Sequence, residues 1–269
     1  MAIDPRGAMV DPAKRFSIAG KSVIVTGASG AMGSEAAKAL GAAGANVTLA
    51  GTNVAVLEQL CALPELTGHS TIVARRPDEL ADAEAIIAGA VDAFGGIDGM
   101  LVASGMNKVG LIADQSVADW ESVMDANVKG SWLMAKAAAP VLIDQGRGGS
   151  VVLVSSTRGK LGHPAGYTAY CPSKAAVDLL GKTLAAEWGS HQIRCNVLAP
   201  TVFRSELTAW MYADDEKGRA TREAMFSRIP LKRFAEPEDF VGALIYLLSD
   251  SSSFMTGQVL YLDGGYTAC

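Results

Sequence analysis

The sequence predicts an α/β fold: a single Rossmann-like, doubly wound parallel sheet of about seven strands with helices on both faces. Short β-branched runs alternate with helical patterns along the 269 residues, and this alternation is typical of parallel sheets. Each predicted strand is apolar throughout, as expected when helices cover both of its faces. The first strand also runs directly into a glycine-rich turn and a helix, an arrangement that binds dinucleotides.

The composition indicates one globular domain in the cytoplasm. Hydrophobic residues make up 49% of the chain and charged residues 19%, and the chain is long enough for one large core. A net charge of -5 provides no basic surface for nucleic acid. No apolar run reaches the length of a membrane span, and the N-terminus lacks the hydrophobic stretch of a signal peptide. The cysteines and histidines show no metal or disulfide spacing, so we expect reduced thiols and no metal.

The first part of the chain contains a complete strand-helix-strand unit. Residues 1–19 form a polar lead-in with the composition of a flexible segment, and the domain proper spans 20–269. The β-branched strand 21–26 is followed by the glycine turn 27–33 and an alanine-rich helical pattern that ends at Gly44. Strand 46–50 completes the unit. Glycines also occur in ordinary strand-to-helix turns, but a unit of this length favours a dinucleotide site.

The alternation continues to the C-terminus without an internal repeat or a long linker. Further strands are predicted at 69–74, 99–103, 150–155, 194–199 and 258–262 from their short apolar runs. Helices are predicted at 54–62, 79–94, 117–143 (one helix or a pair), 168–188 and 237–248, and the segment 203–228 is less regular.

Four segments that follow predicted strands should meet in one crevice. They are the glycine turn 27–33, Gly105, Ser156 and the stretch 200–205. In an open parallel sheet, ligands bind at the carboxyl ends of the strands. This convergence predicts a binding site at that edge.

Tyr170 and Lys174 carry the chemistry that the sequence suggests for this crevice. Four residues apart on a helix, they share a face, so an ammonium would lie beside a phenol. A neighbouring positive charge lowers a tyrosine pKa from its usual value near ~10. Such a tyrosine can donate or accept a proton near neutral pH. The same spacing also occurs by chance on ordinary helices.

Taken together, the ordered motifs resemble the short-chain dehydrogenase/reductase family over residues 16–268. The glycine pattern appears as Thr26-Gly27-Ala28-Ser29-Gly30-Ala31-Met32-Gly33, and the C-terminal pattern as Gly257 followed by Asp263-Gly264-Gly265. The catalytic asparagine, serine, tyrosine and lysine of that family are matched by Asn127, Ser156, Tyr170 and Lys174.

The resemblance implies hydride transfer between a nicotinamide and the carbon of a small-molecule alcohol or ketone. Tyr170 would act as general acid or base, and Lys174 would lower its pKa and hold the nicotinamide ribose. Ser156 would bind the substrate oxygen, and Asn127 would hold a water that links Lys174 to solvent. Preplaced donors of this kind meet the charge that develops on oxygen, while the cofactor supplies the hydride.

The resemblance also implies which residues hold NAD(P). They are Gly27, Ser29, Gly30, Met32, Gly33, Thr52, Arg76, Ser104, Gly105, Tyr170, Lys174, Phe203 and Ser205. An acid at the end of the second strand would favour NAD, but that position is Gly51. With Arg75 and Arg76 nearby, the sequence favours NADP, although an exposed basic pair at a strand end has the same composition.

Three positions depart from the family pattern. The Asn-Asn-Ala-Gly stretch appears as Val102-Ala103-Ser104-Gly105, so local support of the cofactor must be built differently. The loop from Ser156 to Tyr170 is one residue longer than usual, which leaves Thr157 as an alternative to Ser156. Thr201 replaces the usual glycine after Pro200.

The substrate is less well defined. Arg158, His163 and Trp210 are candidate substrate contacts, as is Lys160. The segment 204–228 occupies the place of a substrate lid, and its aromatic and methionine residues suggest either an apolar pocket or the core of an amphipathic helix.

The chain most resembles the sugar or polyol dehydrogenases and the 3-oxoacyl reductases. By the same resemblance we expect a homotetramer that pairs the Tyr170 helix across a symmetry axis. A cofactor-binding regulatory or scaffold protein without turnover is the alternative, because the Val-Ala-Ser-Gly and Thr201 positions are altered.

Overall fold

Seven parallel strands form one sheet at the centre of the molecule, which confirms the predicted fold class. The structure, a computed structural model, describes residues 11–205 and 208–269. The strand order is β3-β2-β1-β4-β5-β6-β7. The strands are β1 (Ser22–Thr26), β2 (Asn46–Ala50), β3 (Ser70–Val73), β4 (Gly99–Val102), β5 (Gly149–Val154), β6 (Ile193–Pro200) and β7 (Val259–Leu262).

The strand order reverses between β1 and β4, and this reversal positions the site. From β1 the chain moves outward to β3, and it then returns to pair β4 with the other side of β1. Connections that leave β1 and β4 in opposite directions open a crevice at the carboxyl ends of those strands. The glycine turn and the Val-Ala-Ser-Gly loop both begin there.

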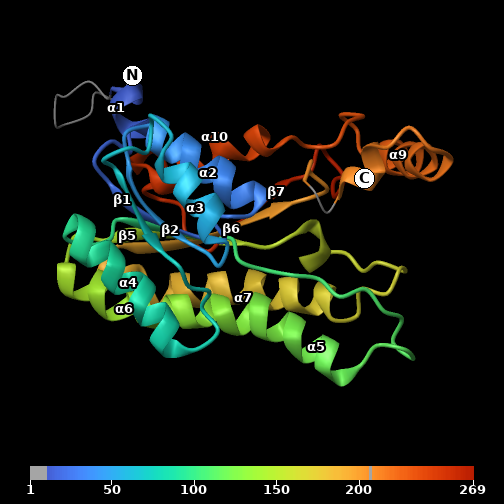
Figure 1. Cartoon of the computed structure of the whole chain (residues 1–269), viewed down its shortest axis with the longest axis horizontal. Coiled ribbons are helices and arrows are strands. Elements are labelled where there is room, and N and C mark those ends of the chain that lie inside the picture. Colours follow the sequence, from blue (N-terminus) through green and yellow to red (C-terminus); the bar gives the residue numbers. More distant parts are fainter. Residues whose placement is uncertain (1–10, 206–207) are drawn as a thin grey trace, which may run out of the picture.

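Helices cover both faces of the sheet (Figure 1). One layer consists of α2 (Ala31–Ala42), α3 (Val54–Cys61) and α10 (Val241–Leu248); the other consists of α4 (Leu80–Phe94), α5 (Val117–Met124), α6 (Gly130–Gln145) and α7 (Tyr170–Trp188). Each layer has its own hydrophobic core against the sheet. Most of the β1 to β6 side chains are therefore buried on both faces, which explains why these strands show no polar alternation.

A π-helical segment, Asp125–Lys129, joins α5 to α6. The predicted helix or helix pair at 117–143 is therefore one interrupted helix. π-helical turns displace side chains from the regular helical spacing and occur often at functional sites. This one carries Asn127, whose side chain is buried.

Part of the predicted lead-in belongs to the fold. Residues 1–10 lie outside the described part of the chain, but Pro12–Phe16 form the short helix α1. The Phe16 ring lies 6.2 Å from that of Tyr246 on α10, and Ile18 is buried in the core beneath α2. Composition alone missed these contacts because they form only when the C-terminal part of the chain is in place.

The predicted lid contains two helices, α8 (Ala209–Tyr212) and α9 (Glu216–Arg228), while residues 206–207 lie outside the described part. Most of its large apolar side chains pack into a satellite core around Ile229, Phe234 and Tyr266. The side chains in that cluster include Met211, Tyr212, Met225 and Phe226. For these four residues, the structure supports the helix-core interpretation.

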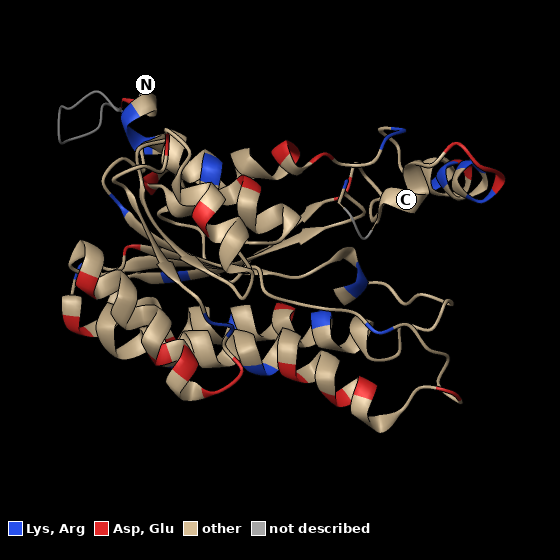
Figure 2. Ribbon diagram, viewed as in Figure 1, with Lys and Arg blue, Asp and Glu red and all other residues tan. Residues whose placement is uncertain are grey.

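Charged residues of both signs are interspersed on the helices of both layers (Figure 2). In the described part of the chain, every helix is too short or too polar to span a bilayer.

Candidate active site

The glycine turn after β1 is compact because two of its glycines make contacts that a side chain would block. Gly27 has a φ of 67°, in the left-handed region that favours glycine. Gly33 lies on the first turn of α2, and a Cβ atom there would stand 2.1 Å from the Gly27 carbonyl oxygen. Helix α2 therefore packs directly on the backbone of the turn.

The start of α2 fits the phosphates of a dinucleotide. Its N-cap is Gly30, which is exposed and offers no side-chain acceptor to the first-turn backbone N–H groups. Those donors and the positive end of the helix dipole attract an anion. Ser29 and Met32, both half-buried, flank this position. The residues present therefore match the NAD(P) group that the sequence predicts.

The altered Val-Ala-Ser-Gly loop is supported from the neighbouring strand. The Thr26 hydroxyl accepts hydrogen bonds from the backbone N–H groups of Ala103 (3.2 Å) and Ser104 (3.3 Å). One side chain thus joins the end of β1 to the loop after β4. Sequence reasoning placed Thr26 in the glycine motif but missed this role, which depends on the pairing of β1 with β4.

Asn127 fixes the other end of that loop. Its Oδ1 accepts from the Met106 N–H (2.7 Å), and its Nδ2 donates to the Met106 carbonyl (2.9 Å) and to the Ser173 hydroxyl (2.9 Å). Ser173 in turn donates to the Tyr170 carbonyl (2.7 Å). A Cβ at Gly105 would lie 2.9 Å from Asn127 Oδ1 and 3.5 Å from Lys174 Nζ. The loop, the π-helical segment and α7 therefore converge at one point.

Lys174 is buried on α7 beside the end of β5. Its Nζ donates to the Val154 carbonyl (3.0 Å) and lies 5.6 Å from the centre of the Tyr170 ring. Burial lowers the pKa of Lys174 to about 8, although the carboxylate of Asp178 acts in the opposite direction. Asp178 lies one further turn along the same face of α7, and its Oδ1 has no partner among the described residues. The sequence analysis overlooked this carboxylate, although its spacing from Lys174 was a visible signal.

Tyr170 begins α7, and its phenol interacts with the side chain of Ser156. Burial raises the pKa of Tyr170 to about 12, against the opposing effects of the Ser156 side chain and of the positive charge on Arg158. The predicted lowering of this pKa by Lys174 is therefore wrong for this arrangement of side chains. Lys174 directs its ammonium to Val154 while desolvation of the phenolate dominates.

Three consecutive residues with hydroxyl groups, 155–157, follow β5, and their side chains make different contacts. Ser155 is buried and donates to the Lys174 carbonyl (3.0 Å). Ser156 accepts from the backbone N–H of Arg158 (3.2 Å), and its side chain acts on the Tyr170 phenol. Thr157 is buried and opens a short 3-10 turn. Of the three, Ser156 is therefore the one whose side chain affects Tyr170.

We expect Lys174→Met to stabilise the protein at pH 7, by about 1 to 3 kcal/mol. The folded-state pKa of about 8 lies below the ordinary 10.5, so the wild type bears the full cost of a buried ammonium below pH 8. That cost falls as the pH rises from 8 to 10.5, because the folded state then binds fewer protons than the unfolded chain. Urea unfolding at pH 7 and at pH 10.5 measures the difference, and a gain that is equal at both values would contradict the prediction.

The residues predicted to select the cofactor lie at the carboxyl ends of β2 and β3. Gly51 is buried, and a Cβ atom there would stand 3.1 Å from the Ser29 hydroxyl. Thr52 follows it and is exposed. Arg76 is exposed and pairs with Asp78 (2.6 Å), while Arg75 pairs with Asp82 (2.7 Å). Both arginines are therefore ion-paired on the surface.

The remaining predicted residues differ in how they relate to Tyr170. Phe203 forms a short bridge with Ala235, and the Thr208 hydroxyl accepts from the Ser205 N–H (2.9 Å). The His163 ring stacks on Tyr167 (4.4 Å), and the Tyr167 ring meets Tyr170 edge-on (5.9 Å). Trp210 is 43% exposed and its ring lies 4.9 Å from Lys217 Nζ. Within the described residues, no contact joins Trp210 to Ser156, Tyr170 or Lys174.

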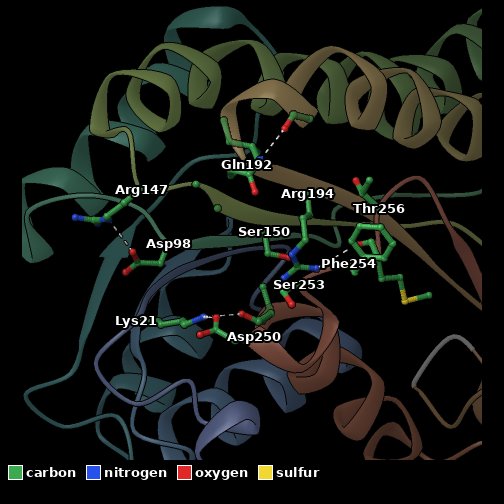
Figure 3. A pocket seen from close by; sticks show the side chains of 16 residues that line it. Lys21, Asp98, Arg147, Ser150, Gln192, Arg194, Asp250, Ser253, Phe254 and Thr256 are labelled. Carbon is green, nitrogen blue, oxygen red and sulfur yellow. Dashed lines mark hydrogen bonds and ion pairs between the residues drawn. The ribbon is translucent and has the colours of Figure 1, made fainter. Parts of the chain in front are cut away.

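A separate cavity of about 600 Å³ lies at the opposite, amino-terminal edge of the sheet (Figure 3). The Lys and Arg side chains that line this cavity already form ion pairs or hydrogen bonds with other groups of the protein. Lys21 pairs with Asp250 (3.0 Å) and Arg147 with Asp98 (3.0 Å). The Arg194 guanidinium donates to the backbone carbonyls of Leu247, Ser249 and Met255. These contacts join the strand starts to the C-terminal segment, so the cavity is distinct from the site around Tyr170.

Known proteins resemble this chain over nearly its whole length. Residues 27–267 match the family described as Enoyl-(Acyl carrier protein) reductase. An uncharacterized oxidoreductase of Mycobacterium tuberculosis (strain ATCC 25618 / H37Rv) is 63% identical over 255 residues, which cover 95% of this chain and 94% of that protein. L-rhamnose 1-dehydrogenase (NAD(P)(+)) of Sphingomonas sp. (strain SKA58) is 36% identical over 91% of this chain and 96% of its own length.

A solved structure shows the same architecture. Gluconate 5-dehydrogenase from Burkholderia cenocepacia J2315, in complex with NADP and tartrate, matches with a TM-score of 0.88 and 27% sequence identity. The match covers 96% of this chain and 100% of that chain. All three of these proteins are named as dehydrogenases or oxidoreductases.

Proposed function

Because the chain belongs to the short-chain dehydrogenase/reductase family of oxidoreductases, we propose that it interconverts a secondary alcohol and a ketone of the sugar or polyol type. One observation carries the proposal. Ser156, Tyr170 and Lys174 gather beside Gly105 and Asn127, at the carboxyl edge of the sheet where the glycine turn opens. The names of the rhamnose and gluconate dehydrogenases support the substrate class.

Tyr170 is the proton donor or acceptor in this proposal. A phenol with a pKa of about 12 stays protonated near neutral pH, so it is ready to protonate a carbonyl oxygen during reduction. In oxidation, the phenolate form of Tyr170 takes the hydroxyl proton of the alcohol and becomes the phenol again, and the positive charge of Arg158 favours that phenolate form. Ser156, whose side chain acts on the same phenol, holds the substrate oxygen within reach.

Residues on four loops would hold the cofactor, whose nicotinamide supplies or accepts the hydride when bound. The start of α2 would take the pyrophosphate, and Lys174 would bind the nicotinamide ribose. Gly105, Phe203 and Ser205 would border the nicotinamide. Asn127 positions Met106, the residue after Gly105, and Ser173 through its three hydrogen bonds. A water beside Lys174 would complete the relay that the resemblance implies.

Fluorescence titration with NADH and NADPH tests the proposal first. A panel of sugars, polyols and their ketones, assayed with the tighter cofactor, then tests turnover. We expect binding of at least one cofactor and oxidation of at least one polyol. A protein that binds cofactor yet exchanges hydride with no alcohol or ketone would instead support a regulatory or scaffold role, the alternative favoured by the altered Val-Ala-Ser-Gly loop.

We propose NADP as the preferred cofactor, because the Gly51 position carries no acid to repel a 2'-phosphate. Gly51→Asp is then expected to weaken NADPH binding about tenfold or more while changing NADH binding much less. Gly51→Asn is the matched control, because it adds a side chain of the same size without a charge. If the NADPH-to-NADH affinity ratio is the same in both variants, charge at this position does not select the cofactor.

We also propose a homotetramer that acts in the cytoplasm. Large apolar side chains are exposed on the outer helices α5, α6 and α7, among them Trp120 (43%), Trp132 (48%) and Leu179 (65%). Apolar faces of this kind mark protein interfaces. A monomeric mass by sedimentation at micromolar concentration would contradict the assembly.

A further inference from the structure

Arg158 is a buried cation without an acidic partner. Its side chain is 9% exposed, and its guanidinium donates to the Gly162 carbonyl (3.2 Å) and the Tyr266 hydroxyl (3.3 Å), which are both neutral. In the ranges 11–205 and 208–269, it forms no ion pair, whereas six exposed arginines do. Burial of an uncompensated charge is costly, so buried charges normally have a counter-ion.

A second arginine approaches the same aromatic ring. The Arg228 guanidinium carbon lies 4.4 Å from the centre of the Tyr266 ring, and the Arg158 guanidinium carbon lies 5.5 Å from it. Arg228 is exposed and has no ion pair among the described residues. Asp263 fixes the turn that carries Tyr266, because its carboxylate accepts from the N–H groups of Gly265 (2.9 Å) and Thr267 (2.8 Å). Two guanidinium groups are therefore held around one rigid ring.

Arg158 lies close to the reacting groups in the chain and in charge. Its backbone N–H donates to Ser156 Oγ (3.2 Å), and the positive charge of its side chain acts on Tyr170, His163 and Cys171. Burial, with Arg158 and Arg228 both contributing, lowers the pKa of His163. His163 is therefore uncharged at neutral pH, and it forms a wall with Tyr167 that continues to Tyr170. Arg158 and Arg228 thus both place positive charge near His163.

Resting on the proposed function, we propose that Arg158, assisted by Arg228, binds the carboxylate of a hydroxy acid or polyhydroxy acid whose secondary alcohol faces Tyr170 and Ser156. A guanidinium matches a carboxylate with two parallel hydrogen bonds, which fixes orientation as well as charge. The carboxylate is unchanged in the reaction. The carbinol carbon loses a hydride to the nicotinamide, and its hydroxyl loses a proton to Tyr170, which leaves a keto acid.

Matched pairs of acids and neutral polyols test the proposal. D-gluconate and D-glucitol have the same carbon count, and further aldonate and alditol pairs of four and five carbons extend the series. We expect the wild type to prefer the acid in at least one pair. Arg158→Gln should lower kcat/KM for that acid at least about tenfold, mainly through KM, as expected for the loss of a charge-assisted hydrogen bond. Its kcat/KM for the neutral polyol should fall several-fold less, because the neutral substrate loses only the effect of this charge on the Tyr170 phenolate.

Lys160→Gln is the matched control, because it removes a positive charge from the same loop. Lys160 is exposed and its Nζ lies 5.2 Å from the centre of the Tyr261 ring. We expect no change in the preference for acids. Arg228→Gln, on an exposed side chain, provides a second test if Arg158→Gln does not fold, and it should raise KM for acids alone. Equal losses on acids and neutral polyols in both arginine variants would assign these residues a structural role and overturn the proposal.

A binding measurement separates this proposal from the proposed function. In the presence of NADP⁺ or NAD⁺, D-gluconate should raise the Tm of the wild type more than D-glucitol does at equal ionic strength, and Arg158→Gln or Arg228→Gln should reduce the difference. If no acid of the series raises the Tm, the carboxylate site is wrong even if neutral polyols are oxidised. If acids bind through these arginines but no alcohol or ketone is turned over, the proposed function alone fails.

Discussion

Tyr170→Phe is expected to lower kcat at least about a thousandfold while leaving the affinity for NAD(P) within about twofold of wild type. The substitution removes only the phenol oxygen, so the ring can keep its edge contact with Tyr167. Without that oxygen, no group at this position can exchange a proton with the substrate. Steady-state kinetics and the fluorescence titration measure the two quantities separately.

Tyr167→Phe is the control for this prediction. It removes a neighbouring hydroxyl from a ring that contacts both His163 and Tyr170, and we expect it to keep most of the activity. Full activity in Tyr170→Phe would overturn the assignment of the general acid. If Tyr170→Phe also lost cofactor binding, its lower activity would reflect a disturbed binding site and would not identify Tyr170 as the proton donor.

Gly33→Ala should weaken cofactor binding at least about a hundredfold and destabilise the protein by about 2 kcal/mol. The new Cβ would meet the Gly27 carbonyl oxygen at 2.1 Å and the Ala28 Cα at 2.9 Å. Both are backbone atoms, so neither can move aside as a flexible side chain could. Helix α2 would shift away from the turn, and its first N–H groups would no longer face the pyrophosphate.

Gly30→Ala provides the comparison for that substitution. A Cβ at Gly30 would come no nearer than 3.3 Å to the Gly27 oxygen, and its φ of -88° is accessible to any residue. We therefore expect a stability change below about 1 kcal/mol and a much smaller loss of affinity. Equal effects at the two positions would mean that the close approach of Gly33 is not what shapes the site.

Several features of the fold follow from local patterns. The strands were predictable because most of them are buried on both faces, and a strand buried in this way forms a short apolar run that the sequence shows by itself. Tyr170 and Lys174 share a face of α7 because their spacing matches the helical repeat. The glycine turn was recognisable because only glycine fits positions such as 27 and 33.

Other features depend on contacts between distant parts of the chain. Thr26 supports the loop at 103–104 only because β1 pairs with β4. The sequence could not tell whether Met211, Tyr212, Met225 and Phe226 line a pocket or a helix core, because their core contains the distant residue Tyr266. Arg158 and Arg228 lie far apart in sequence, and Tyr266 brings them together.

By itself, the sequence determined the order of strands and helices along the chain, the glycine turn and the identity of the residues around Tyr170. Only the tertiary structure decided in which direction the pKa values of Tyr170 and Lys174 shift. Residue spacing suggested that Lys174 would lower the pKa of Tyr170, but burial raises that pKa to about 12 and lowers that of Lys174 to about 8. The physical reason is that desolvation depends on every atom packed around a charge, and those atoms come from segments that sequence spacing cannot place.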